Sequence, residues 1–441
     1  MGRCGRNYES PPAPGRTSVI PMGEILRKSV LPNGIRVVTE GVAHVRSVAV
    51  GVWVETGSRH EPEPLRGISH FIEHLVFKGT ESRSGPEIAR AVDSVGGQMD
   101  AFTAKEHTCF YLSVLDEHLP LAVELLIDIL LHPRFSPEDM EREKSVIAQE
   151  IRMVEDAPDD LIHDLFAERV WPGHPLGRPI LGSWEVIQGL RRDEISNYYR
   201  EEYTPGRITI AVAGHVDHEN VVELFHRHLG GFVRPGPARN GTPPKLVPQC
   251  EVIGKTLEQV HFCLGLPGLP QAHPARYVLA VLNDIVGGSM SSRLFQEIRE
   301  QEGLVYSIYS ASLAFKDAGL LFVYAGTDEE KFDRVVTLIL RELRGIRNQG
   351  VTPEEVLRAK EHLKGSLVLS LESTSSRMNR LARQELYHGH FITLDEMLAA
   401  IDAVSLREVQ DLAQELLDGS QLSLVALGPV RTPPSREALI L

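Results

Sequence analysis

Strand-like runs of apolar residues occur in two similar sets along the chain. The run VAVGVWV around Gly51 resembles VHFCLGL around Gly265, and RITIAVAG, which ends at Gly214, resembles QLSLVALG, which ends at Gly428. Short, continuous apolar runs of this kind are typical of buried strands. In each pair the second glycine follows the first by 214 positions. Because both order and spacing are kept, the pattern predicts two copies of one domain.

Two helices are predicted to begin at equivalent places in the two copies. Ser136-Pro-Glu-Asp and Thr352-Pro-Glu-Glu each place a hydroxyl at the N-cap, proline at the next position and acids in the first turn. Each half then reads as strands, several helices and a closing strand. This order predicts an α+β fold with two homologous domains, each a mostly antiparallel sheet with helices packed on one face.

Proline and glycine mark the boundary between the copies. Residues 231–248 have the composition of an extended, semi-rigid linker. The predicted domains are therefore residues 23–230 and residues 249–435. Residues 1–22 are expected to be a disordered extension, and residues 436–441 a short tail.

Composition narrows the class of protein. The chain has 441 residues, 46 basic and 60 acidic, for a net charge of −14, so it lacks the basic excess of a nucleic-acid-binding protein. No run of about 18 apolar residues predicts a membrane span. The cysteines match no zinc or disulfide spacing, which indicates free thiols in a reducing compartment; they are Cys4, Cys109, Cys250 and Cys263. We therefore expect a cytoplasmic protein.

The segment HFIEH, with His70, Glu73 and His74, has the residues of a metal site. The apolar residues around it recur with helical spacing, which puts His70 and His74 on one face about a turn apart. Two imidazoles so placed can reach one tetrahedral zinc ion at roughly 2.0–2.1 Å. Glu73 stands beside them as a base for metal-activated water, in the inverted zincin order HxxEH. The alternatives are a solvated face or buried histidines with other partners.

A third ligand is expected from the helix after Ser136. Glu143 and Glu150 fall in its apolar stripe, which otherwise contains Met140, Ile147, Ile151 and Val154. Acids on a core-facing stripe are costly unless they are paired or bind a metal. Either glutamate is therefore a candidate ligand, with the other supporting a histidine. Pairing of a buried acid with Arg or Lys is the alternative for each.

The second copy acts as a control for this site. At the positions equivalent to the three motif residues and the two glutamates it has Asp284, Gly287, Gly288, Ala359 and Ser366. Residues needed only for packing should be similar in both copies. Their joint replacement indicates that the five form one functional set in residues 23–230.

With these residues, the chain resembles the pitrilysin and insulinase family of inverzincin metallopeptidases, and within it the bacterial relatives of the mitochondrial processing peptidase beta subunit. The resemblance extends over residues 27–430. The motifs that carry it are Leu31–Val37, Gly51–Gly57, His70–Thr80, Gly96–Thr103, His174–Gly182 and Ser291–Phe295.

The resemblance implies a role for each residue of the set. His70, His74 and Glu150 would hold one zinc ion per chain. Glu73 would be the general base, and Glu143 would support the site from outside the ligand set. Glu150 is preferred over Glu143 because of its place just before Ile151 and its distance of 76 positions from His74.

The family resemblance also implies that a peptide substrate adds as a strand to a sheet edge beside the metal. Here that edge would be Gln98–Thr103, with Ala101 and Phe102 as substrate-binding residues. Main-chain pairing of this kind accepts many sequences. Asp100 stands where the family more often has Asn, which puts the details of backbone contact there in question. An ordinary edge strand after a Gly-Gly turn is the alternative.

In the second copy, Arg299 and Tyr306 match a family pair that binds substrate or polarises the scissile carbonyl. A guanidinium and a phenol are suitable donors for a developing oxyanion. Family members with four such domains enclose the peptide. A two-domain chain would reach that number as a homodimer, or as a heterodimer with a related chain, with this pair facing the partner's zinc.

The function expected from the sequence is that of a zinc-dependent endopeptidase. It would cleave peptides or unfolded protein segments by Glu73-assisted attack of zinc-bound water. The alternative is a non-catalytic structural or assembly subunit of a processing-peptidase-like complex. Subunits of that kind commonly lose the histidine motif, which this chain retains.

Overall fold

The computed structural model describes residues 25–239, 241–430, 432–434 and 439. The predicted disordered extension, residues 1–22, lies outside the described residues, and so does all of the predicted tail except residue 439. None of the helices in the described ranges combines the length and apolar character that crossing a membrane requires.

The first half contains a six-stranded sheet in the order β1-β2-β6-β3-β5-β4. Neighbouring strands are antiparallel except β2 and β6, which are parallel. The strands are β1 (Ile25–Val30), β2 (Arg36–Gly41), β3 (Ser47–Val54), β4 (Gln98–Thr103), β5 (Thr108–Leu115) and β6 (Ile208–Gly214).

The second half contains a five-stranded sheet in the order β7-β11-β8-β10-β9. Its one parallel pair in the described residues is β7 with β11. The strands are β7 (Cys250–Gly254), β8 (Val260–Pro267), β9 (Val305–Ala314), β10 (Gly319–Thr327) and β11 (Ser423–Gly428). This order repeats that of the first sheet without β1, so the predicted α+β fold with two homologous, mostly antiparallel sheets is confirmed.

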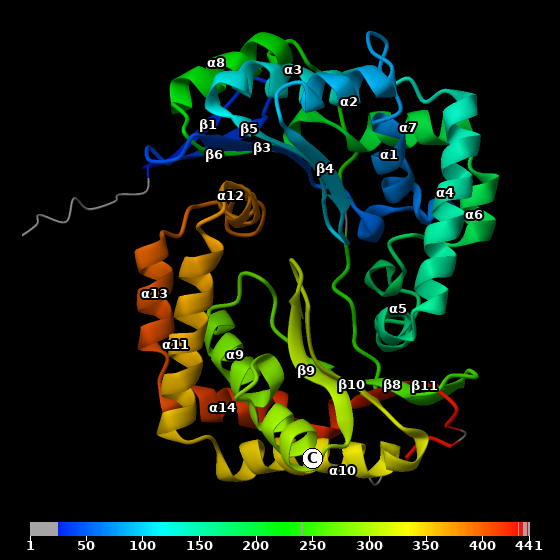
Figure 1. Ribbon diagram of the computed structural model, residues 1–441, viewed down its shortest axis with the longest axis vertical. Coiled ribbons are helices and arrows are strands. Elements are labelled where there is room, and N and C mark those ends of the chain that lie inside the picture. The colour runs from blue at the N-terminus through cyan, green and yellow to red at the C-terminus, as the bar shows by residue number, and fades with distance from the viewer. Residues whose placement is uncertain (1–24, 240, 431, 435–438, 440–441) are drawn as a thin grey trace, which may run out of the picture.

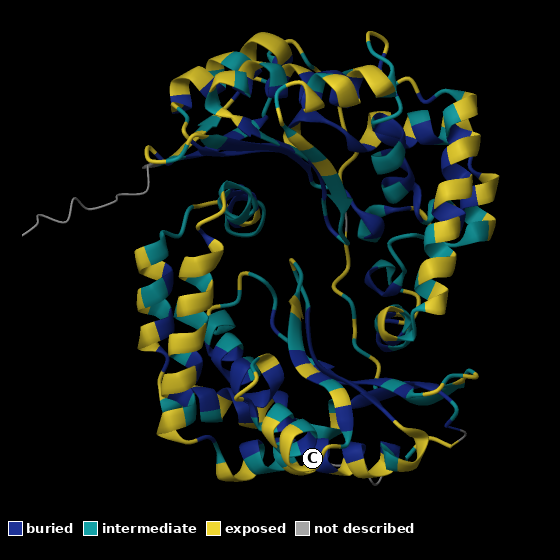
Figure 2. Cartoon of the chain, in the orientation of Figure 1, coloured by how far each residue is buried: buried dark blue, intermediate teal, exposed yellow. Residues whose placement is uncertain are grey.

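Helices of each half cover one face of its own sheet and enclose a hydrophobic core. In Figure 2 the strands are largely buried, and the exposed residues follow the outer faces of the helices. The first half contains α1 (Ile68–Val76), α2 (Gly85–Asp93), α3 (Leu119–Leu131), α4 (Pro137–Asp156), α5 (Pro158–Val170), α6 (Trp184–Gly189), α7 (Arg192–Glu202) and α8 (His218–Leu229). The second contains α9 (Arg276–Asn283), α10 (Phe332–Gln349), α11 (Pro353–Ser370), α12 (Thr374–His388), α13 (Leu394–Ala403) and α14 (Leu406–Leu416).

The opposite face of each sheet is covered by a helix from the other half. α12 packs on the first sheet, where Trp53 Nε1 lies 3.3 Å from Met378 Sδ. α5 packs on the second sheet (Figure 1). Glu40 of β2 is fully buried and pairs with Arg377 and Arg380 of α12. Because a buried carboxylate needs such partners, these contacts hold the halves in one arrangement.

The described residues between α8 and β7 form neither helix nor strand and cross from the first half to the second (Figure 1). Arg239 in this segment pairs with Glu202 of α7, and the Val247 amide donates to the Val170 carbonyl at 2.9 Å. The segment is therefore attached to the first half along its course.

Candidate metal centre

α1 carries the HxxEH segment on a short helix with one buried face. Ile68, Phe71 and Ile72 are completely buried in the core of the first half. His70 and His74 lie on the opposite face of the helix, with their ring centroids 4.7 Å apart. The helical spacing predicted from the sequence therefore brings the two imidazoles together.

α4 places Glu150 opposite these imidazoles. The helix begins after Ser136, whose Oγ accepts the Asp139 amide at 3.1 Å, as the capping pattern predicts. Glu150 Oε2 lies 3.7 Å from His70 Nε2 and 3.5 Å from His74 Nε2. Within the described residues, this is the group of His, Cys, Asp and Glu side chains whose ligand atoms all lie within 4.8 Å of one another.

The chemistry of these groups fits a zinc ion. Burial, aided by the charge of His74, lowers the pKa of His70 to about 3, so its imidazole is neutral and has a lone pair to offer. Glu150 Oε2 is buried and has no hydrogen-bond partner among the described residues. An unpaired buried carboxylate oxygen is costly. Two imidazoles and one carboxylate around a common point are a ligand set typical of catalytic zinc, with the fourth position left for water or substrate.

Glu143 lies on the same buried side of α4 but reaches the other nitrogen of His74. Its side chain is 2% exposed, and its Oε2 accepts from His74 Nδ1 at 3.1 Å. Its Oε1 pairs with Lys78 Nζ at 2.9 Å. A carboxylate on Nδ1 fixes the tautomer that presents Nε2 to a metal. Glu143 thus contacts Nδ1 of His74, and its supporting role toward a metal stays a prediction.

Glu73 projects from α1 beside the histidines and is held by Thr103 of β4. Thr103 Oγ1 donates to Glu73 Oε2 at 2.5 Å. Burial raises the pKa of Glu73, while this hydrogen bond lowers it. A carboxylate with a raised pKa can hold and release a proton closer to neutral pH than an exposed one.

β4 is the last strand of the first sheet, as expected for a peptide-binding edge. Ala101 packs toward the core that contains α1, on the face from which Thr103 reaches Glu73. Phe102 points to the other face, where its ring meets Trp53 edge-on at 5.4 Å between centroids. Asp100 accepts from the Ala101 amide at 2.8 Å. Of the two predicted substrate-binding residues, only Ala101 shares a face with the candidate base.

Arg299 and Tyr306 lie together in the second half, on the π-helical turn Phe295–Gln301 and on edge strand β9. The Arg299 guanidinium lies 5.3 Å from the Tyr306 ring centroid. Tyr306 is 80% exposed. No hydrogen bond, ion pair or ring contact in the described residues joins either side chain to His70, His74 or Glu150. Their role toward a metal centre stays a prediction.

The second copy joins the equivalent elements through a different pair of side chains. Asp284, which replaces the first histidine, lies in the π-helical turn Asp284–Gly288 after α9. Its Oδ1 is 2.6 Å from His362 Nδ1 of α11. A carboxylate–imidazole pair therefore links α11 to this turn, where the first copy has three converging ligand atoms between α1 and α4.

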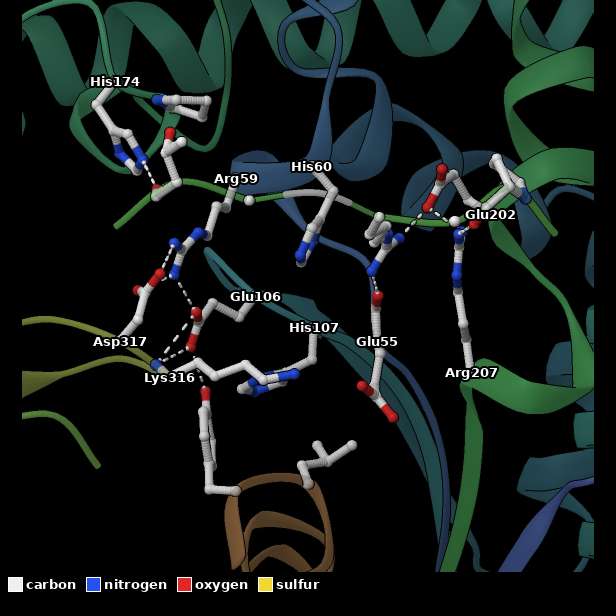
Figure 3. Close-up of a pocket in the computed structure, with 18 residues that line it drawn as sticks. Glu55, Arg59, His60, Glu106, His107, His174, Glu202, Arg207, Lys316 and Asp317 are labelled. Atoms are coloured by element: carbon white, nitrogen blue, oxygen red, sulfur yellow. Dashed lines mark hydrogen bonds and ion pairs between the residues drawn. The ribbon is translucent and has the colours of Figure 1, made fainter. Parts of the chain in front are cut away.

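A cavity of about 740 Å³ lies where the two halves and the connecting segment meet (Figure 3), and the candidate metal ligands do not line it. On its wall, Arg59 donates to Glu106 at 2.6 Å and to both oxygens of Asp317 at 2.7 and 2.6 Å. Tyr387 also donates to Glu106, at 2.9 Å. Because these acids and bases pair with one another, they link the two halves across the cavity wall.

Three largely buried histidines predict loss of stability in acid. Burial is the main cause that lowers the pKa of His60 to about 2, of His70 to about 3 and of His107 to about 4. The unfolded chain, with pKa about 6.5, binds these protons first. The contribution of these histidines to stability is therefore full above pH 6.5 and falls as the pH is lowered, by up to about 1.4 kcal/mol per pH unit and group.

The measurement is the urea midpoint of metal-free protein from pH 7.5 to 5. Burial raises the pKa of Glu61 to about 7. The contribution of Glu61 to stability therefore has the opposite pH dependence, because it is lost as the pH rises toward 7. We therefore compare slopes: His60→Gln should flatten the pH dependence relative to the unchanged chain. Equal slopes would contradict a neutral buried His60.

Sequence reasoning missed residues that contact the site only through the fold. Thr103 ends the motif Gly96–Thr103, but its hydrogen bond to Glu73 depends on how β4 meets α1. Lys78 lies four positions after His74, just beyond the end of α1, and pairs with Glu143 of α4. Glu61 lies six positions before Gly67, the N-cap of α1, and no local pattern in the sequence indicates its contact with that amide.

Comparisons with known proteins agree with this arrangement. A family model described as Insulinase (Peptidase family M16) matches residues 36–183, which include the candidate metal ligands. A model described as Peptidase M16 inactive domain matches residues 189–363, in the half where those ligands are replaced.

Relatives are similar over nearly the whole chain. "Uncharacterized zinc protease YmxG" of Bacillus subtilis is 41% identical over 93% of this chain and 100% of its own length. An uncharacterized zinc protease of Streptomyces coelicolor is 41% identical over 95% of this chain and 94% of its own.

Two crystal structures show the same fold. A protease from Helicobacter pylori superimposes with a TM-score of 0.85 at 23% identity, covering 92% of this chain and 100% of that one. A peptidase M16 inactive domain from Pseudomonas fluorescens gives 0.87 at 17% identity, covering 93% and 99%. Together, the family models and the long matches to the bacterial zinc proteases show that this chain belongs to the insulinase family of peptidases, M16.

Proposed function

We propose that this protein is a zinc-dependent endopeptidase that cleaves peptides or unfolded protein segments. The observation that carries the proposal is the convergence of His70 Nε2 and His74 Nε2 of α1 with Glu150 Oε2 of α4. Glu73 lies on α1 between the two histidines. The homologues described as zinc proteases support the metal and the class of reaction.

The protein's own groups divide the work. His70, His74 and Glu150 would hold one zinc ion, and Glu143 would keep His74 oriented through Nδ1. When bound, zinc lowers the pKa of a coordinated water toward about 7 and polarises a carbonyl. Glu73 accepts the proton of the attacking water on its carboxylate and passes it to the leaving amine. Thr103 holds Glu73 in place for both transfers.

Substrate would lie along β4 as an added strand. The outer edge of β4 offers main-chain groups to a peptide, and Ala101 lies on the face that leads to Glu73. Arg299 and Tyr306 would donate to the developing oxyanion from a second chain, in a homodimer or a heterodimer. The exposure of Tyr306 and the contact of its ring with the Arg299 guanidinium support this role. The dimer and the cytoplasmic location stay predictions.

Metal removal tests the proposal. Purified protein is expected to contain about one zinc per chain and to cleave a mixed peptide library. A chelator should abolish cleavage, and added zinc should restore it, because the three ligand groups have no other way to activate water. Metal content by mass spectrometry and peptide products give the readouts.

Protein that binds no zinc would overturn the proposal and favour the non-catalytic subunit instead. Protein that binds zinc and cleaves no peptide would leave a zinc hydrolase of another bond as the remaining class.

A further inference from the structure

The N-terminus of α1 has no capping side chain of its own. Its N-cap is Gly67, in the left-handed conformation with φ 89°. A Cβ there would lie 2.6 Å from the Leu181 carbonyl oxygen, so a larger residue does not fit. The first amides of the helix therefore need an acceptor from elsewhere in the chain.

Glu61 provides that acceptor from six positions upstream. Its Oε2 accepts the Gly67 amide at 2.7 Å, and its Oε1 accepts the Ser69 amide at 2.8 Å. The residue is 3% exposed. Arg178 Nη1 donates to the Glu61 carbonyl at 3.0 Å, and Ser69 Oγ lies 3.0 Å from Tyr198 Oη. The Glu61 carboxylate is thus held by two amides at the helix entry, and Arg178 holds the main chain of the same residue.

A buried carboxylate is a costly way to cap a helix, and the chain has cheaper ones. α4, α11 and α13 are capped by hydroxyls at Ser136, Thr352 and Thr393. Burial raises the pKa of Glu61 to about 7, even though the hydrogen bonds from the Gly67 and Ser69 amides lower it. Capping alone would not require a negative charge buried at the N-terminus of α1.

The charge has a use toward a metal. His70 is the third residue of α1, so a dication on it lies near the end of the helix that carries partial positive charge. That arrangement repels the ion. A carboxylate on the same end offsets the repulsion, and a nearby cation in turn favours the ionised carboxylate.

We propose that Glu61 is a positioning residue of the metal centre. Glu61 fixes the N-terminus of α1, and its negative charge raises the affinity of the metal centre for a divalent cation. The inference rests on the zinc site proposed above. It requires neither contact between Glu61 and the metal nor a role in proton transfer.

The test measures zinc affinity by chelator competition at pH 8, together with the absorption bands of the Co²⁺-substituted protein. Glu61→Gln keeps the size and removes the charge, and we expect about tenfold weaker zinc binding. Glu61→Asp keeps the charge on a shorter side chain, and we expect about threefold weaker binding with shifted cobalt bands.

Glu87→Gln is the matched control. Glu87 caps α2 through the Ser84 amide at 2.8 Å, and α2 carries no metal ligand. This variant should lower the melting temperature of the metal-free protein and leave zinc affinity unchanged. A melting scan of each metal-free variant separates loss of fold from loss of affinity.

The outcomes are distinct. If the unchanged chain binds zinc and Glu61→Gln binds it equally well, the inference is wrong while the proposed function stands. If Glu61→Gln does not fold, Glu61→Asp decides: unchanged affinity and unchanged cobalt bands overturn the inference. If the unchanged chain binds no zinc, the proposed function fails and the inference fails with it.

Discussion

Replacing Glu73 by glutamine is expected to leave zinc bound and to lower kcat for peptide cleavage by about 10²–10⁴-fold, the usual contribution of a general acid–base group. The amide keeps the size of the side chain and can still accept the Thr103 hydroxyl on its oxygen, but it cannot take up a proton. The measurement is cleavage of a peptide under single-turnover conditions, with zinc content determined on the same sample.

Glu155→Gln is the control for this experiment, because Glu155 is an exposed acid on α4. Full activity of the Glu73 variant would remove Glu73 from the mechanism. Loss of zinc together with activity would show instead that the substitution disturbs the metal site.

The second large effect separates the two glutamates of α4. Glu150→Gln should weaken zinc binding by more than the roughly tenfold to hundredfold loss expected when an outer partner such as Glu143 is replaced. Glu150 Oε2 faces Nε2 of both histidines, whereas Glu143 contacts only Nδ1 of His74. Removing Glu150 would thus delete the proposed carboxylate ligand, while removing Glu143 would loosen one imidazole and leave Lys78 without this partner.

The readout is the zinc dissociation constant of each variant by chelator competition, with Glu155→Gln as the exposed control on the same helix. A larger loss for Glu143→Gln than for Glu150→Gln would reverse the assignment of ligand and supporting residue.

Much of this site was predictable because it depends on local periodicity. His70 and His74 are four positions apart on a helix, so the helical repeat alone makes them neighbours. Ser136-Pro-Glu-Asp predicts the start of α4 because an N-cap acts through residues within one turn. The repeat predicts the second sheet because equal strands in equal order form equal pairings.

The structure also supplied what no local pattern contains. The stripe on α4 placed Glu143 and Glu150 on one side, but their partners depend on where along α4 the shorter α1 crosses it. The hydrogen bond from Thr103 to Glu73 likewise depends on how β4 approaches α1. All of these contacts join segments that become neighbours only when the chain folds.

The sequence alone thus determined two related α+β domains and a helix that pairs two imidazoles, and it indicated the family. The tertiary structure alone decided which carboxylate faces which nitrogen, which hydroxyl holds the candidate base, and that the buried Glu61 caps α1 from an upstream loop. Periodicity acts over a few residues along the chain, whereas these contacts are set by the packing of elements that lie far apart in it.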